Sequence, residues 1–85
     1  MMYRVDWLKE AEVALAQACL DSSDRTYLTQ IAHRLETYLS AVPLEIGRPL
    51  SSSVHRLVRL DSLIHEFNAI EDDKHVFVMD AWLIE

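Results

Sequence analysis

Three runs in the second half of the chain, at residues 54–60, 63–70 and 75–83, are rich in Val, Ile, Leu and aromatic residues, as β-strands are. Polar residues recur within them, and the period of two that is typical of strands with one buried face assigns their two faces, although Arg56 and His65 break the pattern. The breaks between them, Asp61-Ser62 and residues 71–74, are polar and short enough to close hairpins. The pattern therefore predicts a meander of three antiparallel strands.

The first half of the chain predicts one strand and two helices. Residues 2–6 alternate as a half-buried strand does, and strong helix formers follow from about residue 8–10. The polar residues 21–24 can cap a second helix, which we expect from residue 25 to about residue 40. The expected apolar stripes of the two helices are Leu8, Ala11, Leu15, Ala18 and Cys19, and then Leu28, Ile31, Leu35, Tyr38 and Leu39.

A loop is expected at residues 41–53, which hold the only glycine and both prolines. The order strand, helix, helix, strand, strand, strand predicts an α+β fold, in which a helical hairpin packs on one face of a mainly antiparallel four-stranded sheet. The chain is too short for two cores, so residues 1–85 are expected to form a single domain.

Charge argues against general attraction to nucleic acid, because 14 acidic and 8 basic residues give a net charge of −6. The distribution is uneven, however: residues 47–60 hold three arginines and no acid, and residues 61–85 hold seven acids and one lysine. A local basic face on an acidic body therefore remains open. The chain has neither a signal peptide pattern nor an apolar run of about 18 residues, so a cytoplasmic protein with no membrane partner is expected.

Candidate chemistry lies on the predicted sheet. His55 and Arg59 share one face of their strand, where His55 as a general base and Arg59 as a phosphate-stabilising group would suit RNA cleavage. An exposed histidine without a catalytic role is the plainer interpretation. His55, His65 and His75 lie on three different strands, but no second ligand motif accompanies them, so neither a metal nor a cofactor is expected.

Four further residues are candidates for target or partner binding. Arg48 and Arg56 belong to the acid-free segment, and Trp82 is a candidate core or interface anchor. Arg56 and His65 interrupt apolar stretches, which is typical either of functional residues or of residues satisfied by local hydrogen bonds.

Several stretches, in their order along the chain, match the pattern of one known family. They are Tyr3-Arg4-Val5-Asp6-Trp7, Glu10-Ala11 with Leu15, Pro43, Gly47-Arg48-Pro49-Leu50, His55-Arg56-Leu57-Val58-Arg59 and residues 63–73. Together they resemble the RelE/ParE superfamily of type II toxins over nearly the whole chain. The resemblance implies a bacterial or archaeal toxin fold that is held silent by a cognate antitoxin, whose amphipathic segment wraps the helices and the sheet.

The resemblance also separates two activities. RelE-like members cut messenger RNA on the ribosome with Lys and Arg side chains of the sheet and often a C-terminal Arg and Tyr, whereas ParE-like members inhibit DNA gyrase. At the corresponding positions this chain has His55, Leu57 and Ile64, and its last strand has neither the Arg nor the Tyr. Most of the family's ribonuclease residues are therefore absent.

Three hypotheses follow. The first is a toxin component that acts by protein binding, either ParE-like with gyrase as the target or a catalytically degenerate RelE-like member. The second is a ribosome-dependent mRNA endoribonuclease with an atypical set of Arg48, His55, Arg56 and Arg59. The third is an acidic interaction or oligomerisation domain with no toxin role. Homodimer formation is compatible with all three.

Overall fold

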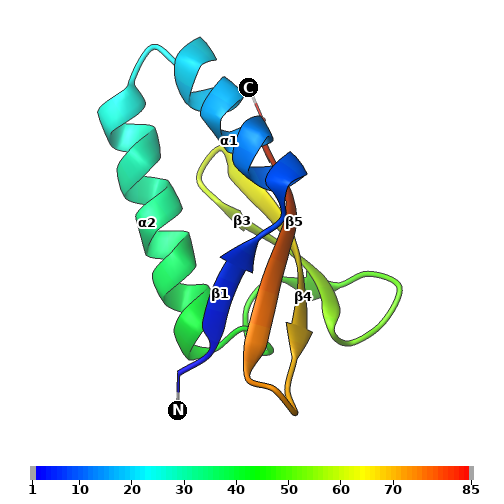
Figure 1. The fold of residues 1–85 in the computed structure, drawn as a ribbon. Helices are drawn as coiled ribbons and strands as arrows, with labels where there is room; N and C mark the ends of the chain where they lie inside the picture. Colours follow the sequence, from blue (N-terminus) through cyan, green and yellow to red (C-terminus); the bar gives the residue numbers. More distant parts are fainter. Residues whose placement is uncertain (1, 85) are drawn as a thin grey trace.

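The computed structural model describes residues 2–84, in which two helices and a five-stranded sheet form (Figure 1). The elements in chain order are β1 (Arg4–Trp7), α1 (Lys9–Asp21), α2 (Arg25–Ala41), β2 (Arg48–Pro49), β3 (His55–Leu60), β4 (Leu63–Ile70) and β5 (His75–Leu83). The predicted α+β class and the order of its elements are confirmed.

The strands lie in the order β1-β5-β4-β3-β2, with β1 parallel to β5 and all other pairs antiparallel. The predicted meander is thus confirmed, but the count of four strands was one short. The fifth is β2, a two-residue strand inside the segment expected to be a loop, where Arg48 pairs with Leu57 and Pro49 with Arg56. A proline has no amide to donate, so β2 suits the edge of the sheet that it occupies.

Local signals place most boundaries within two residues of the prediction. The Asp24 side chain caps α2 by accepting a hydrogen bond of 3.0 Å from the amide of Tyr27. The turns between the strands of the meander form where expected, and Asp61 and Lys74 take positive φ values of 56° and 50° there. The first strand begins at Arg4 rather than at residue 2 and extends to Trp7.

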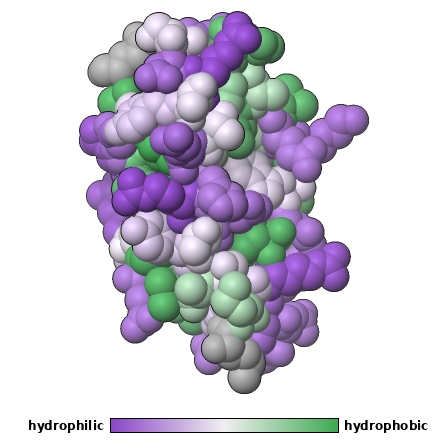
Figure 2. Space-filling model, turned by 90° about the vertical axis from the view of Figure 1, so that its left-hand side faces the viewer, coloured by the Kyte–Doolittle hydropathy of each residue, from purple (hydrophilic) through white to green (hydrophobic). Residues whose placement is uncertain are grey.

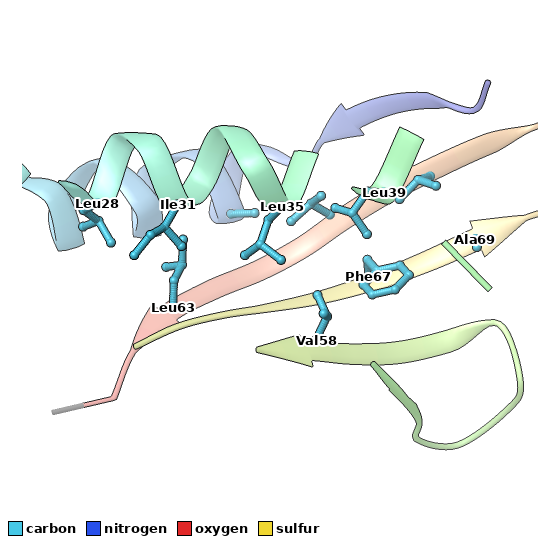
Figure 3. Packing of buried hydrophobic residues seen from close by; sticks show 11 residues of the cluster. Leu28, Ile31, Leu35, Leu39, Val58, Leu63, Phe67 and Ala69 are labelled. Carbon is cyan, nitrogen blue, oxygen red and sulfur yellow. The ribbon is translucent and has the colours of Figure 1, made fainter. Parts of the chain in front are cut away.

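The core lies between α2 and the sheet face that the helices cover (Figure 3). Its fully buried side chains include Leu35 and Leu39 of α2, Phe67 of β4, and Val76 and Val78 of β5. Ala11 is the fully buried residue of α1. A methyl side chain at this point lets the helix backbone lie close to the sheet.

Two residues of the expected stripes are not in the core. Leu8 is 41% exposed, because it is the extended residue before α1 and its side chain does not follow the helical stripe. Tyr38 is 40% exposed, because Leu35 and Leu39 take the core-facing positions and leave Tyr38 at the border of the stripe.

The two faces of the meander are those that alternation predicts. Across the β3–β4 pair, Val58 lies opposite His65 on the covered face. His55, Leu57 and Arg59 lie opposite Asn68, Glu66 and Ile64 on the other side. We call this second side the open face, because the helices do not cover it.

His65 is an ionisable residue inside the core. It is fully buried, and neither ring nitrogen has a hydrogen-bond partner among the described residues. Its ring meets that of Trp7 edge to face, with centroids 4.9 Å apart and planes at 80°. Burial lowers the pKa of His65 to about 4, so the imidazole is neutral at physiological pH.

The free energy of unfolding should therefore fall on acidification. The unfolded chain takes up a proton on His65 below its ordinary pKa of 6.5, while the folded chain does so only near pH 4. The contribution of neutral His65 is complete above pH 6.5 and is lost as the pH falls towards 4, by about 3 kcal/mol in total.

Chemical denaturation between pH 7 and pH 4 measures this loss. The variant His65→Leu has no titrating group at this position and should lose about 3 kcal/mol less than the wild type over the same range. Parallel curves for the two proteins would contradict a buried neutral histidine.

Candidate functional site

A groove on the open face is framed by two arginines around an apolar floor. Its lining residues are Gly47, Arg48, Leu57, Arg59, Ile64 and Ile84. We call it the arginine groove. The floor follows from the register, because Leu57 and Ile64 are neighbours on adjacent strands with their side chains on the open face.

The two arginines of the groove keep most of their donors free. Arg48 is exposed and makes no side-chain hydrogen bond or ion pair within residues 2–84. Arg59 is also exposed, and only its Nε is engaged, donating to the carbonyl oxygen of Asp61 at 2.7 Å. The groove can therefore offer two guanidinium groups to an anionic or carboxylate-bearing ligand.

Arg56 has a different role from the other two arginines. It lies on the covered side of β3, and its guanidinium donates to three backbone carbonyls, those of Ile46 at 3.1 Å, Ser53 at 3.0 Å and Gly47 at 3.3 Å. The arginine that interrupts the apolar pattern is thus satisfied locally, and it ties two segments to β3: residues 46–47, just before β2, and Ser53 in the loop between β2 and β3.

His55 lies between a hydroxyl and a carboxylate. Its Nε2 is 2.6 Å from Oε2 of Glu66, and its Nδ1 is 2.7 Å from Oγ of Ser51. Sequence reasoning missed both partners, because Glu66 reaches His55 only through the β3–β4 pairing and Ser51 only through the bend before β3. A serine four residues before a strand histidine was the one available signal, and it is a weak one.

His55 and Arg59, predicted to act together, lie in different parts of the open face. Four residues along a strand separate their Cα atoms by roughly 13 Å. Leu57 lies between them on the same face, so Arg59 belongs to the arginine groove and His55 to a separate hydrogen-bonded group.

The remaining candidates for target or partner binding, His65 and Trp82, do not line the arginine groove. His65 is in the core and has no exposed surface in this conformation, whereas Trp82 is 37% exposed and lies opposite Ile64 beside the groove. Among residues 2–84 there is no cluster of three His, Cys, Asp or Glu side chains that could hold a metal ion. No helix in the described part of the chain has the length and apolar character needed to cross a membrane.

The sequence matches no protein family model and no curated protein. Solved structures, in contrast, share its fold. A chain of the RelBE2 toxin–antitoxin complex from Mycobacterium tuberculosis superposes with a TM-score of 0.80 at 17% identity, covering 99% of this chain and 100% of that one. A chain of the chromosomal ParDE system from P. aeruginosa gives 0.74 at 16% identity, with 99% and 98% covered. The isolated E. coli RelE toxin gives 0.71 at 19% identity, with 98% and 85% covered.

These similarities define the class of fold. The two helices on a mostly antiparallel sheet superpose, along almost the entire chain, on chains of the RelBE2 and ParDE systems and on the RelE toxin. The chain therefore has a RelE/ParE toxin-like fold, as its sequence motifs predicted.

Replacing Gly47 by alanine should disrupt this edge of the sheet. Gly47 has a φ of +69°, and a Cβ atom there would lie 2.2 Å from the carbonyl oxygen of Leu57. Because that oxygen belongs to the backbone of β3, the clash cannot be relieved by a side-chain rotation. We expect Gly47→Ala to lower the free energy of unfolding by about 2 kcal/mol or more. Ser53→Ala, in the adjoining loop, is the control for thermal and chemical denaturation and should change it by less than about 0.5 kcal/mol.

Replacing Arg56 should lower the free energy of unfolding. Arg56→Gln removes charge-assisted hydrogen bonds to three carbonyls, and we expect a loss of about 1–3 kcal/mol in denaturation experiments. The matched change Arg48→Gln removes an exposed and unpaired guanidinium, so it should cost less than about 0.5 kcal/mol. Equal losses of unfolding free energy in the two variants would show that the three hydrogen bonds of Arg56 do not stabilise the fold.

Proposed function

We propose that the protein is the toxin component of a type II toxin–antitoxin module, that it acts in the cytoplasm by binding a protein target, and that a cognate antitoxin neutralises it. The observation that supports this most is the shared fold, over 98–99% of the chain, with chains from RelBE and ParDE complexes and with the RelE toxin. Gyrase is the target class that a ParE-like member would take.

The open face is better suited to binding than to cutting RNA. Cleavage of a phosphodiester needs several positive groups placed around the developing charge. The floor of the arginine groove is aliphatic instead, and the nearby open-face positions Glu66 and Asp80, which pair in the register, add negative charge. Aliphatic side chains with flanking arginines are typical of a surface that binds a peptide or protein.

The helices offer a second surface suited to an antitoxin. Four large apolar side chains on α1 and α2 are 40–61% exposed: Val13, Leu20, Tyr27 and Tyr38. In the view from the side of α2, apolar surface occurs as separate small areas among polar ones (Figure 2). Scattered contacts of this kind suit an amphipathic segment that wraps the helices better than a single compact partner.

Ribosome-dependent RNA cleavage is the second candidate function. It is favoured by the hydrogen bond between His55 and Glu66, since a carboxylate that orients an imidazole is a common support for a general base. The two candidates make opposite predictions for messenger RNA in cells.

Controlled expression in a bacterial host tests the proposal. The wild-type chain should arrest growth, and co-expression of the product of the adjacent reading frame should restore it. Arg48→Glu combined with Arg59→Glu should recover colony counts at least tenfold, because it reverses both charges of the arginine groove. Arg25→Glu, an exposed change of the same kind in the first turn of α2, is the control and should remain toxic.

Messenger RNA from the arrested cells separates the two functions. Intact message with arrested DNA replication supports protein binding, whereas cleavage of ribosome-bound message that is lost in His55→Ala would establish the ribonuclease instead. Normal growth of cells that contain the folded wild-type protein would overturn the toxin proposal altogether.

A further inference from the structure

Ser51, His55 and Glu66 form a continuous hydrogen-bonded chain at the end of the open face. The hydroxyl of Ser51 is 2.7 Å from Nδ1 of His55, and Nε2 of His55 is 2.6 Å from the carboxylate of Glu66. We propose that this set activates Ser51 Oγ as a nucleophile towards small carboxylic esters, with His55 as the base and Glu66 as its positioning residue. This activity does not rest on the toxin function proposed above.

The direction of the hydrogen bonds follows from the chemistry of the groups. An ionised carboxylate only accepts hydrogen bonds, so the neutral ring of His55 carries its proton on Nε2, facing Glu66. Nδ1 is then an acceptor, and the hydroxyl of Ser51 donates to it. This is the arrangement of nucleophile, base and orienting acid that serine hydrolases use, with the roles of the two ring nitrogens exchanged.

The other histidine–carboxylate pair on the open face lacks this arrangement. Nε2 of His75 lies 2.6 Å from Asp6, and this hydrogen bond is the main reason that the pKa of Asp6 is lowered. Asp6 also accepts from Nε of Arg4 at 3.0 Å, and His75 packs against Phe77 with ring centroids 4.0 Å apart. Within residues 2–84, His55 is the one histidine held between a hydroxyl and a carboxylate.

The surroundings of Ser51 give access to an ester and donors for its oxyanion. Ser51 is exposed, and within the described chain the backbone amides of residues 51–54 make no hydrogen bond. Free amides in a loop beside the nucleophile can bind the oxygen of a tetrahedral intermediate. Leu50 is 42% exposed next to Ser51 and offers an apolar contact for a short aliphatic acyl group.

The reaction has two balanced halves. Oγ of Ser51 attacks the carbonyl carbon of the ester while its proton passes to Nδ1 of His55, and the bond to the leaving alkoxide then breaks as Nδ1 returns that proton to it. Water attacks the acyl-serine in the second half, with His55 again taking and returning the proton, which releases the carboxylic acid and restores Ser51.

Covalent labelling with a fluorophosphonate probe tests the nucleophile on the full chain. The wild-type protein should take up one phosphonyl group on Ser51, identified by peptide mass spectrometry. Ser51→Ala and His55→Gln should reduce the labelling rate at least tenfold. Ser53→Ala, a neighbouring loop serine outside the hydrogen-bonded set, should keep the wild-type rate. Thermal denaturation of each variant checks that it is folded.

Rescue by the shorter carboxylate separates positioning by Glu66 from a purely structural role. In Glu66→Gln the side chain is no longer an obligatory acceptor for the proton on Nε2 of His55, so the labelling rate should fall about tenfold, whereas Glu66→Asp keeps a carboxylate acceptor and should recover most of the rate. A structural role alone would lower the rate equally in both variants. Absence of labelling in the folded wild-type protein, or equal labelling of Ser51, Ser52 and Ser53, would overturn the proposal.

Discussion

Burial of the apolar stripe of α2 against one face of the sheet is the interaction on which the rest of the structure depends. Leu35 and Leu39 have no exposed surface, and neither has Phe67 beneath them (Figure 3). Each such side chain contributes roughly 1.5–3 kcal/mol by leaving water. Because strand side chains alternate between faces, fixing Phe67 inward also fixes Glu66 outward. Leu57, the cross-strand partner of Glu66, and His55, which lies opposite Asn68, then share that outer face. The open face is thus a consequence of the core.

Alternation, capping and turn length were enough to predict most of the fold from the sequence, and the side-chain contacts across the strands were the information that they lacked. The faces of β3 and β4 and the cap at Asp24 follow from local rules, and all are present. The two-residue turn at Asp61-Ser62 sets the register of β3 and β4, but the contact between His55 and Glu66 is diagonal in that register and depends on the conformations of both side chains. β2 was missed for a related reason: two residues carry no periodic signal, and their pairing depends on the positive φ of Gly47. The complete burial of His65 was not predicted either. A histidine buried without a hydrogen-bond partner leaves no pattern in the neighbouring residues of the sequence.

The three arginines of the acid-free segment show how one residue type takes different roles in one short stretch. Arg56 holds the loop, Arg59 donates to a turn carbonyl and lines the groove, and Arg48 makes no side-chain hydrogen bond with any residue that the structure describes. Counting positive charge in the sequence therefore overestimates what the open face can offer to a phosphate. Two guanidinium groups nevertheless lie at the aliphatic floor of the groove, a local gathering of positive charge on a chain whose net charge is −6.

The place of β5 in the sheet has a consequence for biosynthesis. β5 lies between β1 and β4 and pairs with both, and its residue His75 lies beside Arg4, which was made 71 residues earlier (Figure 1). A nascent chain emerging from the ribosome therefore has no strand partner for β1 until β5 has been synthesised and inserted. Contacts so distant in sequence form late and slowly. The sheet therefore forms as one unit only after β5 has been synthesised, and until then β1 and the edge of β4 are exposed strands that can pair with other chains.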